Sequence, residues 1–269
     1  MSNKISVSSR LAISAAVATA LLSGYGGRKA YAGVCGPASP SVCTGPATAG
    51  DVTQAPTPAA TNLTVTTDPL FGITTAAGSA IELLNAVTDT GITFVDDNSS
   101  IISGDWSGLS VHNSGTGATS ITTSGAVTGI REIGISVENR SEATDLSVTA
   151  AGDVTGVHSG IYTRNEGTGT TTVTTTGTAF ATDNFGISAR SIGTATDIII
   201  NAQGDTTGGL VGVIARNEGT GGTSITTTGL AAGVSDYGIF ARNIGTATDI
   251  IINAQGDATG GGVGVGARN

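Results

Sequence analysis

Residues 186–211 read GISARSIGTATDIIINAQGDTTGGLV, and residues 238–263 repeat them as GIFARNIGTATDIIINAQGDATGGGV, with 22 of 26 positions identical. The same framework extends on both sides in 26-residue units that begin at Gly108, Gly134, Gly160, Gly186, Gly212, Gly238 and Gly264. Alternate units agree best, so the larger period is a 52-residue pair. A period of this length indicates supersecondary units that stack on one another.

Each unit is predicted to be extended rather than helical. The ordered runs are rich in Ile, Val and Thr, glycine is dense, and no apolar stripe recurs with a helical period. The chain has 42 Gly, 4% aromatic and 12% charged residues, a composition that suits the thin core of a solenoid better than a compact core. The sequence therefore predicts an all-β parallel β-helix (β-solenoid) with about six 26-residue coils over 108–269.

Columns of equivalent positions predict which side chains of the first strand of each coil point into the core. An aliphatic residue follows each leading glycine and a small or aliphatic residue stands two positions later, so both columns face inward. An outward column carries Arg164, Arg190, Arg216 and Arg242. We expect these arginines to be solvated and to pair with Glu166 and Glu218, and an anion-binding stripe is the alternative.

The column after the arginines is rich in asparagine. It carries Asn165, Asn217 and Asn243, with Ser191 as the exception. We expect these side chains to form an amide ladder at a corner of the coil. Glycines at further corners predict three corners per coil and a triangular cross-section.

The second strand of the coil is harder to orient. Residues 172–174 read Thr-Val-Thr, but residues 198–200 are three isoleucines, which cannot all point inward on a pleated strand. If Asp197 and Asp249 face water, the 26-residue columns predict an outward apolar ridge made of Val173, Ile199, Ile225 and Ile251. If the strand instead turns its other face to water, the outer face shows Ile and Thr in alternation. Either phase leaves apolar surface of the kind that marks interaction sites.

Residues 1–32 are predicted to be an export signal peptide. Lys4 and Arg10 form a basic start, an apolar run follows, and Ala30–Ala32 has the A-x-A pattern of a cleavage site. An uncleaved or unusually long signal is the alternative, because Arg28 and Lys29 stand before that site. The signal predicts export to the outer membrane, the cell surface or the extracellular space.

Two segments separate the signal from the regular coils. Residues 33–61 are rich in Pro, Ala and Thr and are predicted to be a flexible leader. Within it, Cys35 and Cys43 are expected to form a small disulfide loop, with two unrelated thiols as the alternative. Residues 62–107 are expected to form irregular coils that cap the N-terminal edges of the sheets.

Charge and residue types exclude several function classes. Beyond residue 32 the chain has 7 Arg against 20 Asp and Glu, a net charge of −13, which argues against nucleic acid as a partner. His112 and His158 stand in different columns, so they predict neither a catalytic triad nor a zinc site. Asp96, Asp97 and Asn98 lack the frame of a calcium loop. We expect no catalytic residues, no cofactor and no metal.

The recurring unit Gly-Ile-x-Ala-Arg-Asn-x-Gly-Thr-Ala-Thr-Asp-Ile-Ile-Ile-Asn-Ala-Gln-Gly-Asp resembles the passenger repeats of type V autotransporters of Gram-negative bacteria. The resemblance covers about residues 62–269 together with the signal. It implies a right-handed parallel β-helix that a C-terminal outer-membrane barrel carries to the cell surface, and the handedness agrees with the rule for parallel crossovers. The sequence contains no barrel strands. We therefore expect more coils and a barrel in the intact protein, or end-to-end self-association through the open last coil.

The function predicted from these features is that of a structural or adhesive surface stalk, not an enzyme. The expected partner is an unidentified ligand on a host or neighbouring cell. The alternative is a β-helical carbohydrate-active enzyme of the polysaccharide lyase type. Such an enzyme needs side loops that build a cleft, and coils of one length leave no room for them.

Overall fold

The computed structural model describes residues 34–35, 39–48, 52–54 and 62–269. The predicted signal peptide lies outside these residues. The described part of the chain consists of β-strands and loops, and it holds no helix long and apolar enough to cross a membrane.

The strands form three sheets, which we call A, B and C. Sheet A contains β1 (Val34–Cys35), β2 (Ser41–Thr44), β5 (Leu63–Thr67), β8 (Ile92–Asp96), β11 (Thr119–Thr123), β14 (Leu146–Ala150), β17 (Thr171–Thr175), β20 (Ile198–Ala202), β23 (Thr223–Thr227) and β26 (Ile250–Ala254). Sheet B contains β3 (Pro46–Thr48), β6 (Gly72–Thr74), β9 (Ile102–Gly104), β12 (Val127–Gly129), β15 (Val154–Gly156), β18 (Ala179–Ala181), β21 (Thr206–Gly208), β24 (Ala231–Gly233) and β27 (Ala258–Gly260). Sheet C contains β4 (Val52–Gln54), β7 (Ile81–Asn85), β10 (Leu109–Asn113), β13 (Ile133–Asn139), β16 (Ser159–Asn165), β19 (Phe185–Ile192), β22 (Val211–Glu218), β25 (Tyr237–Asn243) and β28 (Val263–Arg268).

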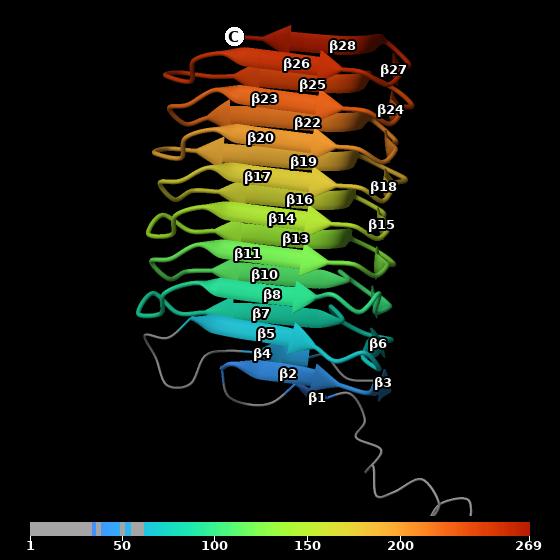
Figure 1. The fold of residues 1–269 in the computed structure, drawn as a ribbon. Helices are drawn as coiled ribbons and strands as arrows, with labels where there is room; N and C mark the ends of the chain where they lie inside the picture. The colour runs from blue at the N-terminus through green and yellow to red at the C-terminus, as the bar shows by residue number, and fades with distance from the viewer. Residues whose placement is uncertain (1–33, 36–38, 49–51, 55–61) are drawn as a thin grey trace, which may run out of the picture. The chain divides into compact units, whose positions relative to one another are not determined.

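The chain passes through sheets A, B and C in that order in every turn. Eight complete turns run from β5 to β28, and β2 to β4 form a first turn before them (Figure 1). In Figure 1 the sheet A strands run to the right in front, the sheet C strands return behind them, and the chain climbs towards β28. This winding confirms the predicted right-handed parallel β-helix. Only β1 and β2 pair antiparallel among the described strands.

The N-terminal turns are more regular than the sequence indicates. Leu63 pairs with Ile92 and Ile92 with Thr119, so the first register step is two positions longer than the second. Residues 62–107 therefore form turns of the same three sheets whose lengths are uneven, and their role as a cap stays a prediction. The uneven steps come from loops of different length, which hide the columns in the sequence but leave the strands aligned.

The predicted flexible leader also contributes strands to the solenoid. In β2, Ser41 pairs with Val65 and Cys43 with Thr67, and the Cys43 side chain is fully buried. Strand β3 begins at Pro46 and is the edge strand of sheet B, a place where a residue without an N–H is tolerated. The described parts of 33–61 therefore contribute strands β1 to β4 to the sheets.

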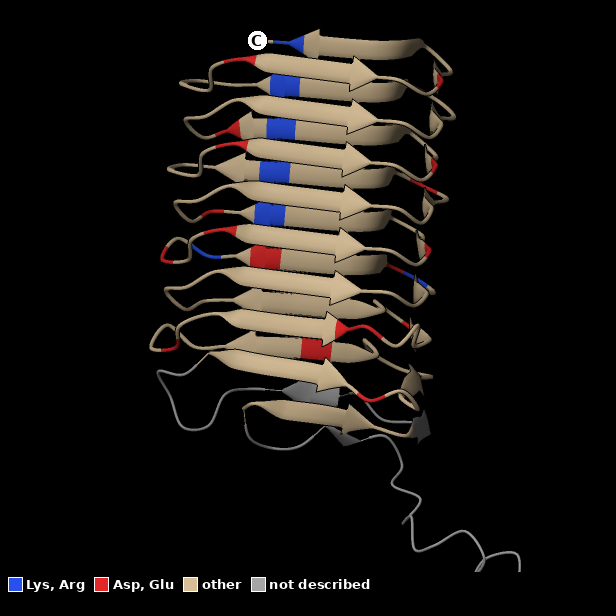
Figure 2. Ribbon diagram, viewed as in Figure 1, with Lys and Arg blue, Asp and Glu red and all other residues tan. Residues whose placement is uncertain are grey.

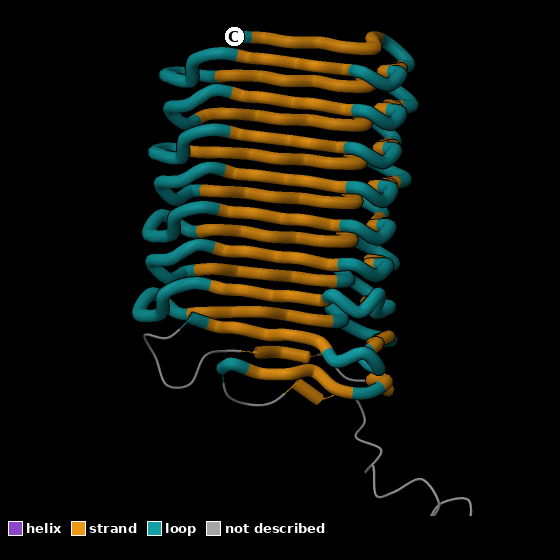
Figure 3. Tube along the Cα trace, viewed as in Figure 1, coloured by secondary structure: helices purple, strands orange, loops and turns teal. Residues whose placement is uncertain are grey.

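The core is a thin stack of inward side chains. In sheet C, Leu109 pairs with Ile135 and Ile135 with Ile161, and all three are fully buried. Sheet C keeps this 26-residue register step from Leu109 to Val265, as the sequence columns predict. Loops are confined to the corners between the sheets (Figure 3).

Sheet A follows a different register, which overturns the predicted ridge of Val173, Ile199, Ile225 and Ile251. Val173 pairs with Ile200, so this register step is one position longer than the 26 residues predicted. Ile200 pairs with Ile225, so the following step is one position shorter than 26 residues. Val173, Ile200 and Ile225 are all buried in the core. Ile199 and Ile251 point outward, 41% and 62% exposed, on either side of the strand that holds Ser224. The outer face of sheet A therefore alternates Ile with Ser or Thr.

The alternating register arises at the corners. The corner between sheets C and A that runs from Ser191 to Ile198 is one position longer than the corner from Asn165 to Thr171. The longer corner contains Gly193 with φ of 68°, a left-handed conformation that costs glycine nothing. The corner between sheets B and C is one position shorter in the same turn, so sheet C keeps its constant step.

A candidate binding groove on the outer face of sheet C

The arginine column lies on the outer face of sheet C with its members directly stacked. Residues in successive turns pair in register, and the column contains His112, Glu138, Arg164, Arg190, Arg216, Arg242 and Arg268. Figure 2 shows the positions of basic residues as one vertical series of blue ribbon segments on successive turns. The stacking follows from the constant 26-residue step of this sheet.

Most of these arginines have carboxylate partners. Glu218 pairs with the Arg190 guanidinium at 2.8 Å and with Arg216 Nε at 2.7 Å, so it bridges two turns. Glu166 pairs with Arg164, and at 3.8 Å with Arg140. These ion pairs neutralise the lower and middle parts of the column.

The two histidines take part in separate structural contacts. His112 Nδ1 lies 3.6 Å from a Glu138 carboxylate oxygen, and this contact, with the charges of His112, Arg140 and Arg164, lowers the pKa of the Glu138 carboxyl against the opposing effect of burial. His158 lies 3.8 Å from both Glu132 and Asp183 at the corner between sheets B and C. The structure does not bring the two histidines together.

Asp96 is a structural acceptor. It is fully buried, and its Oδ1 accepts hydrogen bonds from the hydroxyls of Thr67 and Ser100, each at 2.6 Å. Over the described residues, no group of three or more His, Cys, Asp or Glu side chains is arranged to hold a metal ion.

The asparagine column does not form the predicted amide ladder. Asn217 Nδ2 donates to the carbonyl oxygens of Thr196, Gly221 and Gly222 at 3.0, 3.0 and 3.1 Å, and its Oδ1 accepts from the Gly219 N–H at 2.8 Å. The buried amide faces loop carbonyls that would otherwise be unpaired, so it bonds to backbone rather than to the next amide. Similar contacts with corner backbone or threonine hydroxyls are made by Asn113, Asn139, Asn165 and Asn243.

Cys43 is disulfide-bonded. The antiparallel pairing of β1 with β2 places Cys35 opposite Cys43 in the backbone register. The side chain of Cys35 lies outside the described residues.

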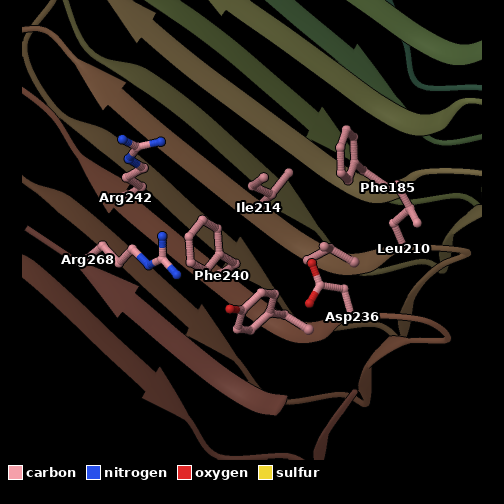
Figure 4. Close-up of a pocket in the computed structure, with 9 residues that line it drawn as sticks. Phe185, Leu210, Ile214, Asp236, Phe240, Arg242 and Arg268 are labelled. Carbon is pink, nitrogen blue, oxygen red and sulfur yellow. The ribbon is translucent and has the colours of Figure 1, made fainter. Parts of the chain in front are cut away.

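A groove of about 410 Å³ opens on the outer face of sheet C near β25 and β28 (Figure 4). Its apolar side chains include Phe185, Leu210, Ile214, Tyr237 and Phe240. The rings of Tyr237 and Phe240 lie 4.7 Å apart with an interplanar angle of 33°. The Tyr237 ring extends over the strand of the next turn, because a Cβ added at Gly266 would lie 2.5 Å from it.

The two ends of this groove differ in charge. Figure 4 shows Arg242 and Arg268 on one side of the Phe240 ring and Asp236 on the other. Among the described residues, neither arginine has a carboxylate within ion-pair distance, in contrast to Arg164, Arg190 and Arg216. The groove therefore combines an aromatic surface with two available cations and one exposed carboxylate.

A second, smaller hollow of about 270 Å³ lies on the outer face of sheet A. It is bordered by Ile199, Ile251, Asp197 and Asp249. The Asp197 side chain accepts a hydrogen bond from the Gly222 N–H at 2.7 Å, so this carboxylate stabilises the corner of the next turn.

The sequence columns locate the arginines but not the groove. One residue of the groove stands where the two most similar units differ: Phe240 replaces Ser188. Such a difference between near-identical units is the signal available in the sequence, because the positions that stacking requires stay the same from unit to unit while a local surface can vary.

In comparisons with known proteins, no family model matches the chain, and no curated protein or solved structure matches it significantly.

Proposed function

We propose that the chain is an exported structural or adhesive stalk of a Gram-negative surface protein, similar to the passenger of a type V autotransporter. The observation that carries the proposal is the uninterrupted solenoid, in which every turn pairs with the next through three parallel ladders. Such a stack is stiff, since each turn is fixed by its neighbours, and it presents long lateral surfaces. That geometry suits a protein that holds a binding surface away from the cell.

The disulfide and the corners support the same proposal. A disulfide persists in oxidising compartments such as the periplasm and the cell surface. The loops are short, and the groove lies on the face of a strand sheet rather than among long side loops. This favours a binding surface over a cleft for catalysis.

Export and oxidation can be tested together in a Gram-negative host. We expect material from the periplasm or the cell surface to begin near Gly33 and to contain Cys35 and Cys43 as an intramolecular disulfide, both measurable by mass spectrometry. A chain that lacks residues 1–32 is the control, and it should stay in the cytoplasm with free thiols. Full-length material that keeps Met1 in the cytoplasm would contradict the proposal.

A further inference from the structure

The groove on sheet C is a local feature, not a property of the repeat. The turn that begins at Gly238 is nearly identical to the turn that begins at Gly186, yet one of their few differences lines the groove. Phe240 adds a ring where the sister turn has Ser188. This change supplies part of the aromatic surface of the groove.

The available positive charge is equally local. Glu166 and Glu218 occupy the same column in alternate turns, and Ile192 and Ile244 occupy it in the others. Arg242 therefore has no acidic neighbour at that position of its own turn, and Glu218 already pairs with two other arginines. In a chain with strong net negative charge, two arginines that lack ion pairs in the described structure and lie beside an aromatic surface favour an anionic ligand.

We propose that this groove binds a carboxylate-bearing pyranose, a uronic or sialic acid unit of an acidic glycan. The Tyr237 and Phe240 rings offer a surface on which the C–H face of a sugar ring can pack. Arg242 and Arg268 can pair with the carboxylate, since a guanidinium matches its planar geometry. Asp236, at the opposite end, can accept hydrogen bonds from sugar hydroxyls.

Other anions fit the groove less well. A nucleic acid would place a series of phosphates along an acidic surface and next to Asp236, which disfavours it. A simple fatty carboxylate has no hydroxyl groups that could donate to Asp236. The volume of about 410 Å³ falls within the ordinary range for small-molecule sites, and it suits one or two sugar units. The ligand is thus defined by one carboxylate, an apolar ring face and several hydroxyls.

The inference rests on the proposed adhesive function, but its test uses the purified chain and does not depend on export. Isothermal titration calorimetry with tetragalacturonic acid and with sialyllactose distinguishes the two acidic sources. The methyl ester of tetragalacturonic acid is the neutral control. We expect at least one acid to bind, the matching neutral sugar to bind about tenfold more weakly or worse, and affinity to fall as salt rises.

Three variants assign the binding to the groove. Phe240→Ser restores the residue of the sister turn and so should keep the fold, and we expect it to weaken binding about tenfold. The double variant R242Q/R268Q should weaken it at least as much. Arg164→Gln, which changes a paired arginine in the same column three turns away, should leave affinity within about twofold.

Several results would overturn the inference. These are equal affinity for the acid and its ester, unchanged affinity in F240S or R242Q/R268Q, or no binding of either acid at millimolar concentration. If the chain is exported and oxidised but binds neither acid, the ligand assignment fails while the stalk proposal stands. If an acid binds but the chain is not exported, the ligand assignment stands while the proposal of an exported stalk fails.

Discussion

Ile200→Asn is expected to lower the free energy of unfolding by about 4 kcal/mol or more, while Ile199→Asn changes it by less than about 0.5 kcal/mol. Ile200 is 1% exposed and lies between Val173 and Ile225 in the core. An amide there loses the burial of the isoleucine and finds no hydrogen-bond partner. Ile199 points to solvent, where the neighbouring turns carry Thr172 and Ser224.

Urea denaturation followed by circular dichroism would measure both effects. Because stacked turns can unfold in steps, the midpoints of the transitions are the quantities to compare. A constant 26-residue register that kept Val173 and Ile225 in the core would place Ile199 there as well and would predict the opposite order. Equal midpoints for the two variants, or a lower midpoint for Ile199→Asn, would contradict the alternating register of sheet A.

The sequence predicts sheet C well and sheet A poorly for one physical reason. A residue added at the corner before sheet A and removed at the corner after sheet B leaves the 26-residue period intact in sheet C but shifts sheets A and B by one position. A shift of one position moves every side chain of a strand to the opposite face of the sheet. Residues 26 positions apart in sheet A therefore do not share a face, and aligning them suggests a ridge that the structure does not have. Register in sheet A therefore depends on corner lengths that column alignment does not reveal.

The corner glycines contain the signal for this shift. The glycines that follow the sheet A strands are Gly125, Gly152, Gly177, Gly204, Gly229 and Gly256. Their spacings alternate between long and short in the same way as the sheet A register, and each lies against the backbone of the one before it. These contacts make the glycine column a better guide to register than the isoleucine runs, because backbone packing tolerates no change there.

The stacked glycines should accordingly be the least tolerant positions of the corners. A Cβ at Gly204 would lie 2.2 Å from the Gly177 carbonyl oxygen and 2.6 Å from its carbon. These are backbone atoms of the adjacent turn and cannot move without breaking the ladder on both sides. We expect Gly204→Ala to lower the free energy of unfolding by about 3 kcal/mol, at the upper end for an overpacked site.

Gly72→Ala is the matched control, because it makes the same chemical change where there is room. The nearest atom to a Cβ at Gly72 is the Ile101 carbonyl oxygen at 3.6 Å, an ordinary contact. Neither glycine has a left-handed φ, so the comparison isolates packing from backbone strain. In β6, alanine should be neutral or stabilise the fold by up to about 1 kcal/mol, since it loses less backbone entropy than glycine. Equal urea midpoints for the two variants would show that the turns can separate at this corner, and the close glycine stack would then not fix the register.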